Sequence, residues 1–80
     1  MRLDKFLKVS RIIKRRSVAN AACDGGNVLV NGKVAKAGLN LKVGDVIEIV
    51  FGEKVSKFKV LSLQDVIKKE ESSLLYEVIE

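Results

Sequence analysis

The basic side chains of this 80-residue chain are concentrated at its N-terminus. Residues 1–16 contain seven of the 15 lysines and arginines and a single acid, Asp4, for a net charge of +6. The whole chain carries +5, so residues 17–80 together contribute −1. A surface that serves only solubility mixes both signs, whereas a concentrated basic segment indicates a polyanionic partner such as RNA. The seven basic residues are Arg2, Lys5, Lys8, Arg11, Lys14, Arg15 and Arg16.

Two adjacent arginines precede a serine at the end of this segment. The planar guanidinium groups of Arg15 and Arg16 match phosphate oxygens in a bidentate way. Ser17 is a residue type that caps helix N-termini, where free N–H groups and the positive end of the dipole add to a phosphate site. The alternative is a solvated run of charges. We favour RNA contact because the run lies within the +6 segment.

Four further bases recur at helical spacing before this junction. Arg2, Lys5, Lys8 and Arg11 are expected opposite an apolar stripe, and an RNA-binding face is favoured over an ordinary amphipathic surface because such surfaces also carry acids. Asp4 is the one acid here and would repel phosphate. We therefore expect Asp4 to be a structural brace that pairs with Arg11 or another base; contact with an RNA 2′-OH is the alternative.

Two lysines follow a predicted tight turn. Asn31-Gly32 is the dipeptide most typical of a two-residue hairpin, so these two residues need no function beyond the turn. Lys33 and Lys36 either add phosphate contacts on the side of the helices or are ordinary surface lysines, and the sequence leaves both possibilities open.

The residue inventory argues against catalysis and against a metal or cofactor. The chain has no histidine, and its one cysteine, Cys23, is expected to be a small buried apolar residue. Gly25-Gly26 is a helix stop and lacks the pattern of a phosphate-binding loop. We expect no enzymatic activity, no metal and no cofactor.

The few aromatic residues bear on how RNA is read. Phe6, Phe51 and Phe58 are expected in the core, which leaves no platform on which unpaired bases could stack. The expected target is therefore a folded RNA, recognised by its shape and phosphates.

The periodicity predicts an α+β fold in which two N-terminal helices pack on a small antiparallel sheet. The first helix is expected at Arg2–Val9, followed by a bend at Ser10–Arg16. The second is expected at Val18–Asp24, capped by Ser17 and ended by left-handed glycines at Gly25 and Gly26. Strands are expected at Val28–Val30, Lys33–Ala35, Val46–Phe51 and Val55–Leu61, with turns at Asn31-Gly32, Gly44-Asp45 and Gly52–Lys54. Lys68–Ser73 suits a helical turn, and Leu74–Ile79 suits a strand or a helix end.

An ordered set of motifs resembles the RNA-binding domain of the ribosomal protein S-four family, also called the αL motif. The set runs through Arg2-Leu3-Asp4-Lys5-Phe6-Leu7, Ser10-Arg11, Val28-Leu29-Val30-Asn31-Gly32-Lys33-Val34, Lys36 and Val43-Gly44-Asp45-Val46-Ile47. The resemblance covers about residues 1–51, and we expect residues 52–80 to add C-terminal strands and a tail to one domain spanning 1–80. Within the family, the chain is similar to the free-standing RqcP/YabO subfamily and to its relative, the ribosome-associated heat-shock protein. Three segments carry this similarity: Met1-Arg2-Leu3-Asp4, Lys14-Arg15-Arg16, and Lys68-Lys69-Glu70-Glu71 with Leu75-Tyr76. The length of this chain fits the RqcP/YabO subfamily better, because the heat-shock protein carries a longer basic C-terminal extension.

This resemblance implies a factor of ribosome-associated protein quality control. Such a factor binds large-subunit rRNA and peptidyl-tRNA on obstructed large subunits, and works with an RqcH/NEMF-type protein during alanine tailing. A heat-shock-type recycling factor and a general rRNA-binding assembly factor are the alternatives within RNA binding. A small β-rich carrier or interaction module is the alternative outside it, but the ending Val78-Ile79-Glu80 lacks a carrier's Gly-Gly. We expect a cytoplasmic monomer with no membrane segment or signal peptide.

Overall fold

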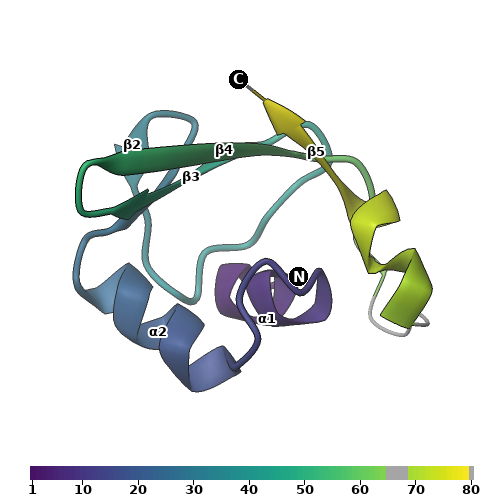
Figure 1. The fold of residues 1–80 in the computed structure, drawn as a ribbon, viewed down its shortest axis with the longest axis horizontal. Helices are drawn as coiled ribbons and strands as arrows, with labels where there is room; N and C mark the ends of the chain where they lie inside the picture. The colour runs from purple at the N-terminus through teal and green to yellow at the C-terminus, as the bar shows by residue number, and fades with distance from the viewer. Residues whose placement is uncertain (65–68, 80) are drawn as a thin grey trace.

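The chain folds into a layer of two helices beneath one face of a five-stranded sheet (Figure 1). The computed structural model describes residues 1–64 and 69–79, apart from the side chains of Lys69 and Ser73. The elements are α1 (Leu3–Val9), α2 (Arg16–Asp24), β1 (Val28–Val30), β2 (Lys33–Val34), β3 (Val46–Phe51), β4 (Lys54–Val60), the 3₁₀ helix η1 (Lys69–Leu75) and β5 (Tyr76–Ile79). The expected α+β architecture is confirmed.

The sheet is antiparallel throughout, with strand order β2-β1-β3-β4-β5. Because side chains alternate along a strand, one face carries the buried residues Val28, Val30, Ile47, Ile49 and Val60, and this face packs against the helices. The opposite face of the sheet is open to solvent in Figure 1.

Helix α1 is held by the apolar stripe that its sequence predicts. Leu3, Phe6 and Leu7 have no exposed surface. The helix starts one residue later than expected, because the N–H groups of Leu3 and Asp4 donate to the carbonyls of Leu39 and Ala37, at 2.8 and 3.1 Å. These bonds satisfy backbone donors that a helix start otherwise leaves free.

The start of α2 shows that the prediction of Ser17 as its N-cap was wrong. The helix begins at Arg16, and Arg15 occupies the extended capping position without a side-chain capping bond. Ser17 therefore lies exposed within the first turn. The reason is a tertiary one, since the guanidinium of Arg16 is bonded to Asp4 of the first helix and fixes Arg16 within the turn.

The end of α2 is a Schellman motif built on one glycine. Gly26 has φ +76°, the N–H of Asn27 donates to the carbonyl of Ala22, and that of Gly26 donates to Cys23. Gly25 has φ −77°, so the expectation of two left-handed glycines was wrong for it. Cys23 is buried, as expected; burial raises the pKa of its thiol, and the charges of Asp4 and Asp24 raise it further.

The strands follow the predicted turns closely. Asn31 and Gly32 both have positive φ, 53° and 83°, as a two-residue hairpin of the favoured type requires. The turn before β3 is also present, with Gly44 at φ +95°. The second and fourth strands end one residue earlier than expected, so Ala35 and Leu61 lie outside them.

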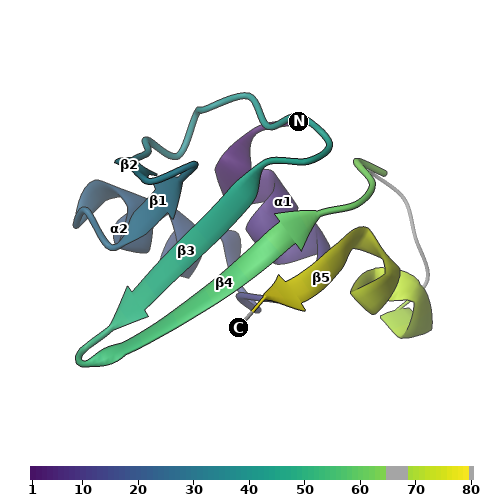
Figure 2. The same ribbon diagram turned by 90° about the horizontal axis from the view of Figure 1, so that it is seen from above.

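The β3–β4 hairpin corrects the expected position of one aromatic residue. Phe51 is 60% exposed instead of buried. Figure 2 shows that the tip of this hairpin projects away from both helices, so the residue has no layer to pack against. Phe58 is half-buried, and its ring packs edge to face against that of Tyr76, with the ring centroids 5.4 Å apart. This contact helps to hold β5 on β4.

The tail forms a 3₁₀ helix and then an edge strand. Leu75 is buried in the core, and Tyr76–Ile79 pairs with β4, which decides between the two possibilities left open for this segment. Lys68, where the helical turn was expected to begin, lies outside the described residues. No helix in the described ranges is long and apolar enough to span a bilayer.

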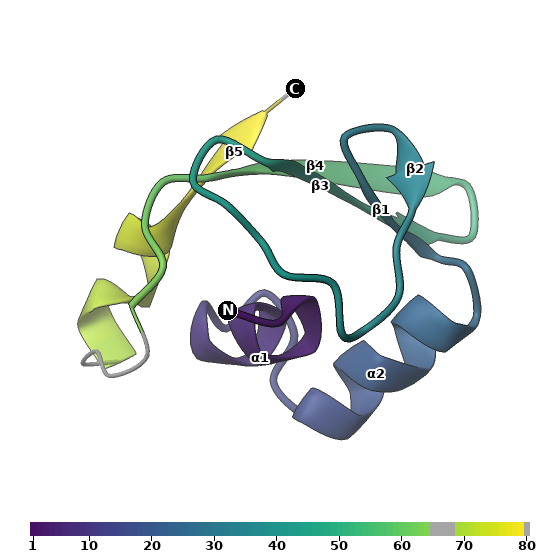
Figure 3. The same ribbon diagram turned by 180° about the vertical axis from the view of Figure 1, so that it is seen from behind.

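A long loop between β2 and β3 ties the N-terminus to the sheet. In Figure 3 this segment descends from the sheet to the helical layer and passes beside the N-terminus. The N–H of Leu41 donates to the carbonyl of Met1 at 2.8 Å, and Arg2 and Asn40 form an antiparallel bridge. The loop therefore lies against the most basic part of the chain.

Candidate nucleic-acid interface

A buried carboxylate joins two arginines from different parts of the chain. Asp4 is 1% exposed, and its oxygens accept hydrogen bonds from Nε of Arg2 and Nε of Arg16, both at 3.2 Å. A second nitrogen of each guanidinium reaches the other oxygen, at 3.5 and 3.4 Å. The Asn20 amide and the N–H of Lys5 also donate to it, at 3.2 and 2.9 Å.

The two arginines remain available to a ligand. Their side chains are 52% and 48% exposed, even though both are bonded to Asp4. Asp4 engages two of the five N–H groups on each guanidinium, which leaves the rest for phosphate oxygens. Arg2 and Arg16, with Lys5 and Asn40, line a hollow of about 500 Å³. Asp4 therefore holds two guanidinium groups in fixed positions around one basic hollow.

The environment of Asp4 keeps it charged. Burial by itself raises the pKa of a carboxyl group, but hydrogen bonds from Arg16, the Lys5 N–H and Arg2, together with the charge of Arg16, bring the pKa of Asp4 below its ordinary 3.8. Asp4 is thus an anion at neutral pH and attracts both arginines.

The structure identifies the basic partners of Asp4 and adds Asn20 to the residues that bind its carboxylate. The partners are Arg2 and Arg16 in place of Arg11. Asn20 was missed from the sequence, although a signal existed. It follows Arg16 by four residues and therefore lies on the same face of α2.

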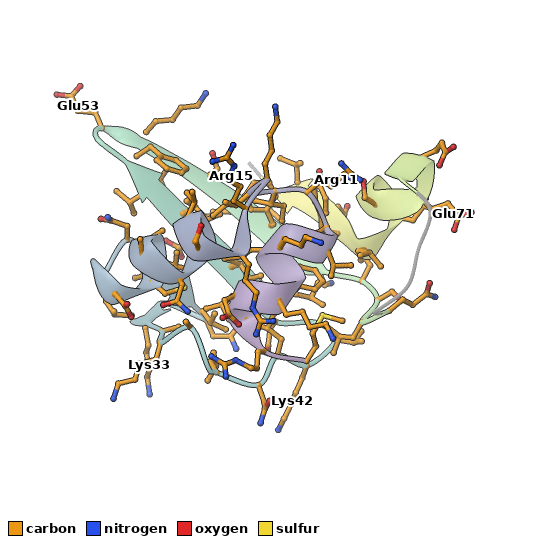
Figure 4. The ribbon with its side chains drawn as sticks, turned by 90° about the horizontal axis from the view of Figure 1, so that it is seen from below. Arg11, Arg15, Lys33, Lys42, Glu53 and Glu71 are labelled. Atoms are coloured by element: carbon orange, nitrogen blue, oxygen red, sulfur yellow. The ribbon has the colours of Figure 1, made fainter. Side chains whose placement is uncertain are left out.

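Four other predicted bases of the N-terminal segment do not line the basic hollow. Lys8, Arg11, Lys14 and Arg15 are exposed. Arg11 has φ +62° where α1 ends, a conformation that a residue with a side chain rarely adopts. Figure 4 shows the Arg11 and Arg15 side chains at one margin of the helical face, on the side away from Lys33 and Lys42. Ser17, another predicted contact, is exposed in the first turn of α2 and does not line the basic hollow.

The remaining predicted bases, Lys33 and Lys36, lie on a neighbouring surface. They line a groove of about 1050 Å³ between the β1–β2 hairpin and the following loop. Lys42 lines the same groove and was not predicted, because it joins the others only through the path of the loop. Asn40 lines both this groove and the basic hollow.

The outer face of the sheet carries a mixture of charges instead. By the alternation of the strands Glu48 is directly opposite Lys57, and Lys59 is opposite Glu77. The excess of positive charge thus belongs to the helical side and the loop. Within the described ranges, no group of three or more metal-ligating side chains lies together.

The chain is similar to known proteins in both sequence and fold. Residues 1–47 match the family model of the S4 domain. The chain is 53% identical over 78 residues to the "RQC P-site tRNA stabilizing factor" of Halalkalibacterium halodurans, covering 98% of this chain and 89% of that protein. It is 54% identical over 79 residues to the protein of the same name from Streptococcus pneumoniae, covering 99% of this chain and 90% of that protein. The structure of trimeric heat shock protein 15 of Vibrio cholerae superimposes with a TM-score of 0.89 at 30% identity, covering 99% of this chain and 81% of that one.

Proposed function

This chain belongs to the S4 domain family and, within it, to the RQC P-site tRNA stabilizing factors (the RqcP subfamily), and from that premise we propose that it stabilises peptidyl-tRNA on obstructed large ribosomal subunits. It binds large-subunit rRNA and the tRNA through its basic helical side, in the cytoplasm where ribosomes work. It acts as a monomer, without catalysis, alongside an RqcH/NEMF-type protein during alanine tailing. One domain, residues 1–80, performs this role.

The pair of guanidinium groups braced by Asp4 is the observation that carries the proposal. Binding costs less when charged side chains are already ordered, because their rotamer freedom is lost on folding and not on association. Two arginines fixed at one buried carboxylate form such a preordered phosphate clamp. Lys5, Lys8, Arg11, Lys14 and Arg15 extend the contact along the backbone of a folded RNA, and no base needs to be unstacked.

Separate Arg2→Ala and Arg16→Ala variants test the proposal. Each is expected to weaken co-sedimentation with purified large subunits without unfolding the domain, because both side chains are about half exposed. Lys57→Ala, which removes one positive charge from the outer face of the sheet, is the control and should co-sediment normally. Normal co-sedimentation of both arginine variants would show that the RNA contact lies elsewhere.

A heat-shock-type recycling role is the second candidate, because the heat shock protein 15 structure shares this fold at a TM-score of 0.89. Deletion of the gene separates the two functions. Loss of alanine tails on stalled chains, to the level seen without the RqcH/NEMF-type partner, supports the tailing role. Tails at normal levels, with large subunits accumulating in obstructed form, support recycling.

A further inference from the structure

Three lysines converge on the groove beside the basic hollow. Lys33 belongs to β2, whereas Lys36 and Lys42 belong to the loop that follows, and all three line one groove of about 1050 Å³. Each is exposed, and none of them is in an ion pair with another described residue. In Figure 4 the Lys33 and Lys42 side chains extend outward at the same margin of the molecule.

The one acid of the groove is occupied within the protein. Asp45 accepts a hydrogen bond from the Asn31 side chain at 3.1 Å and another from the N–H of Lys42 at 2.9 Å. The same carboxylate therefore shapes the loop that carries Lys42. The groove has three cationic side chains against one carboxylate, which leaves a net positive charge.

The walls of the groove are suited to a sugar–phosphate chain. Val34 and Leu39, 66% and 39% exposed, supply apolar surface between the lysines. Asn40 supplies an amide at the border with the hollow that Arg2 and Arg16 line. The backbone bridge between Arg2 and Asn40 holds the two concavities side by side.

We propose that this lysine groove binds a second stretch of RNA backbone, continuous with the phosphates held at Arg2 and Arg16. The inference rests on the proposed function, since it extends the same RNA-binding surface. Phosphate groups are the ligand, and they belong either to rRNA or to the bound tRNA. The groove lengthens the interface from the helical side of the molecule to the β1–β2 hairpin.

The test compares two triple variants with equal loss of charge. The groove variant is Lys33→Gln/Lys36→Gln/Lys42→Gln, and the control is Lys54→Gln/Lys57→Gln/Lys59→Gln on β4. Affinity for purified large subunits is measured over a range of salt concentrations. The groove variant is expected to bind on the order of ten-fold or more weakly, with a log–log salt slope shallower by roughly 2–3, at 0.7–0.9 for each lost phosphate contact. The control is expected to keep the slope of the unaltered protein.

Further binding measurements with the same variants decide whether the phosphates belong to rRNA or to tRNA, and whether the lysines act through their charge. Weakened binding to vacant and to peptidyl-tRNA-bearing subunits alike assigns the groove to rRNA, and weakened binding only to the latter assigns it to tRNA; both support the inference. Lys→Arg replacements at the three positions should restore binding. Equal effects of the groove and β4 variants, or loss of a protein partner with RNA affinity unchanged, would overturn it. If Arg2→Ala still weakens binding in that case, the proposed function stands without the groove.

Discussion

We propose that Asp4 supports RNA binding indirectly, by holding Arg2 and Arg16, although its own charge opposes it. Asp4→Asn keeps the shape of the side chain but weakens its attraction for Arg2 and Arg16, so both guanidinium groups become less ordered. We predict a lower free energy of unfolding, by about 1–3 kcal/mol, and a lower affinity for large subunits. Urea denaturation and co-sedimentation measure the two effects. Asp24→Asn, at an exposed position of α2, is the control and should bind at least as well as the unaltered protein. Tighter binding by Asp4→Asn would contradict the role of a brace.

The same carboxylate makes stability depend on acid pH. The pKa of Asp4 is lower in the folded protein than its ordinary 3.8, so the unfolded chain binds the proton more readily. Its contribution is fully present above about pH 4 and is lost as the pH falls through the folded-state value. The difference in unfolding free energy between the unaltered protein and Asp4→Asn should therefore be larger at pH 7 than at pH 2–3. A constant difference across this range would contradict the prediction.

Arg11 allows backbone strain and ligand contact to be separated. Its φ of +62° costs a residue with a side chain about 1–2 kcal/mol, and glycine avoids this cost while losing some entropy on folding. Arg11→Gly is therefore expected to leave the free energy of unfolding unchanged or to raise it by up to about 1 kcal/mol. Its RNA affinity should fall, because the exposed guanidinium is gone. Arg11→Ala should bind as weakly but unfold more easily, and equal stability of the two variants would argue against strain.

At the scale of elements, α1 depends on its buried stripe. Phe6 has no exposed surface, and its truncation to Ala typically costs about 3–5 kcal/mol. A domain of this size has a total stability of roughly 4–12 kcal/mol, so Phe6→Ala should unfold at far lower urea concentrations. Val43→Ala, at a position 64% exposed, is the control and should change stability little. A small effect of Phe6→Ala would mean that α1 is not anchored as described.

The elements that the sequence predicted correctly are those with local causes. The Asn31-Gly32 hairpin and strand β3 follow from turn chemistry and side-chain alternation within a few residues. The start of α2 and the exposure of Phe51 depend on distant contacts instead. Arg16 reaches an acid 12 residues away, and the hairpin that carries Phe51 projects past the helices. No pattern within either segment reveals these relations.

Over the whole molecule, the sequence shows where the basic residues are concentrated but not which of them lie together in the fold. The charge asymmetry located the seven N-terminal bases, and Asp4 was correctly expected to pair with a base. Which bases meet depends on how α1, α2 and the loop pack together. Asn20 lies 16 residues from Asp4, and Lys42 reaches the groove only through the course of the loop. The helical side and the loop thus form one basic surface, whereas the outer sheet face stays mixed in charge.

This distribution of charge predicts how the whole molecule responds to salt. If about five phosphates are neutralised, the logarithm of the affinity should fall with the logarithm of the salt concentration at a slope of about −3.5 to −4.5. The measurement is a binding titration with purified large subunits between low and moderate salt. A carrier or a protein-interaction module would bind its partner with a nearly flat dependence, since no counterions are released from RNA. A flat line would therefore exclude the RNA-binding surface as a whole. The expected slope, reduced by Arg2→Ala and unchanged by Lys57→Ala, would place bound phosphates on the basic surface formed by the helices and the loop and not on the outer face of the sheet.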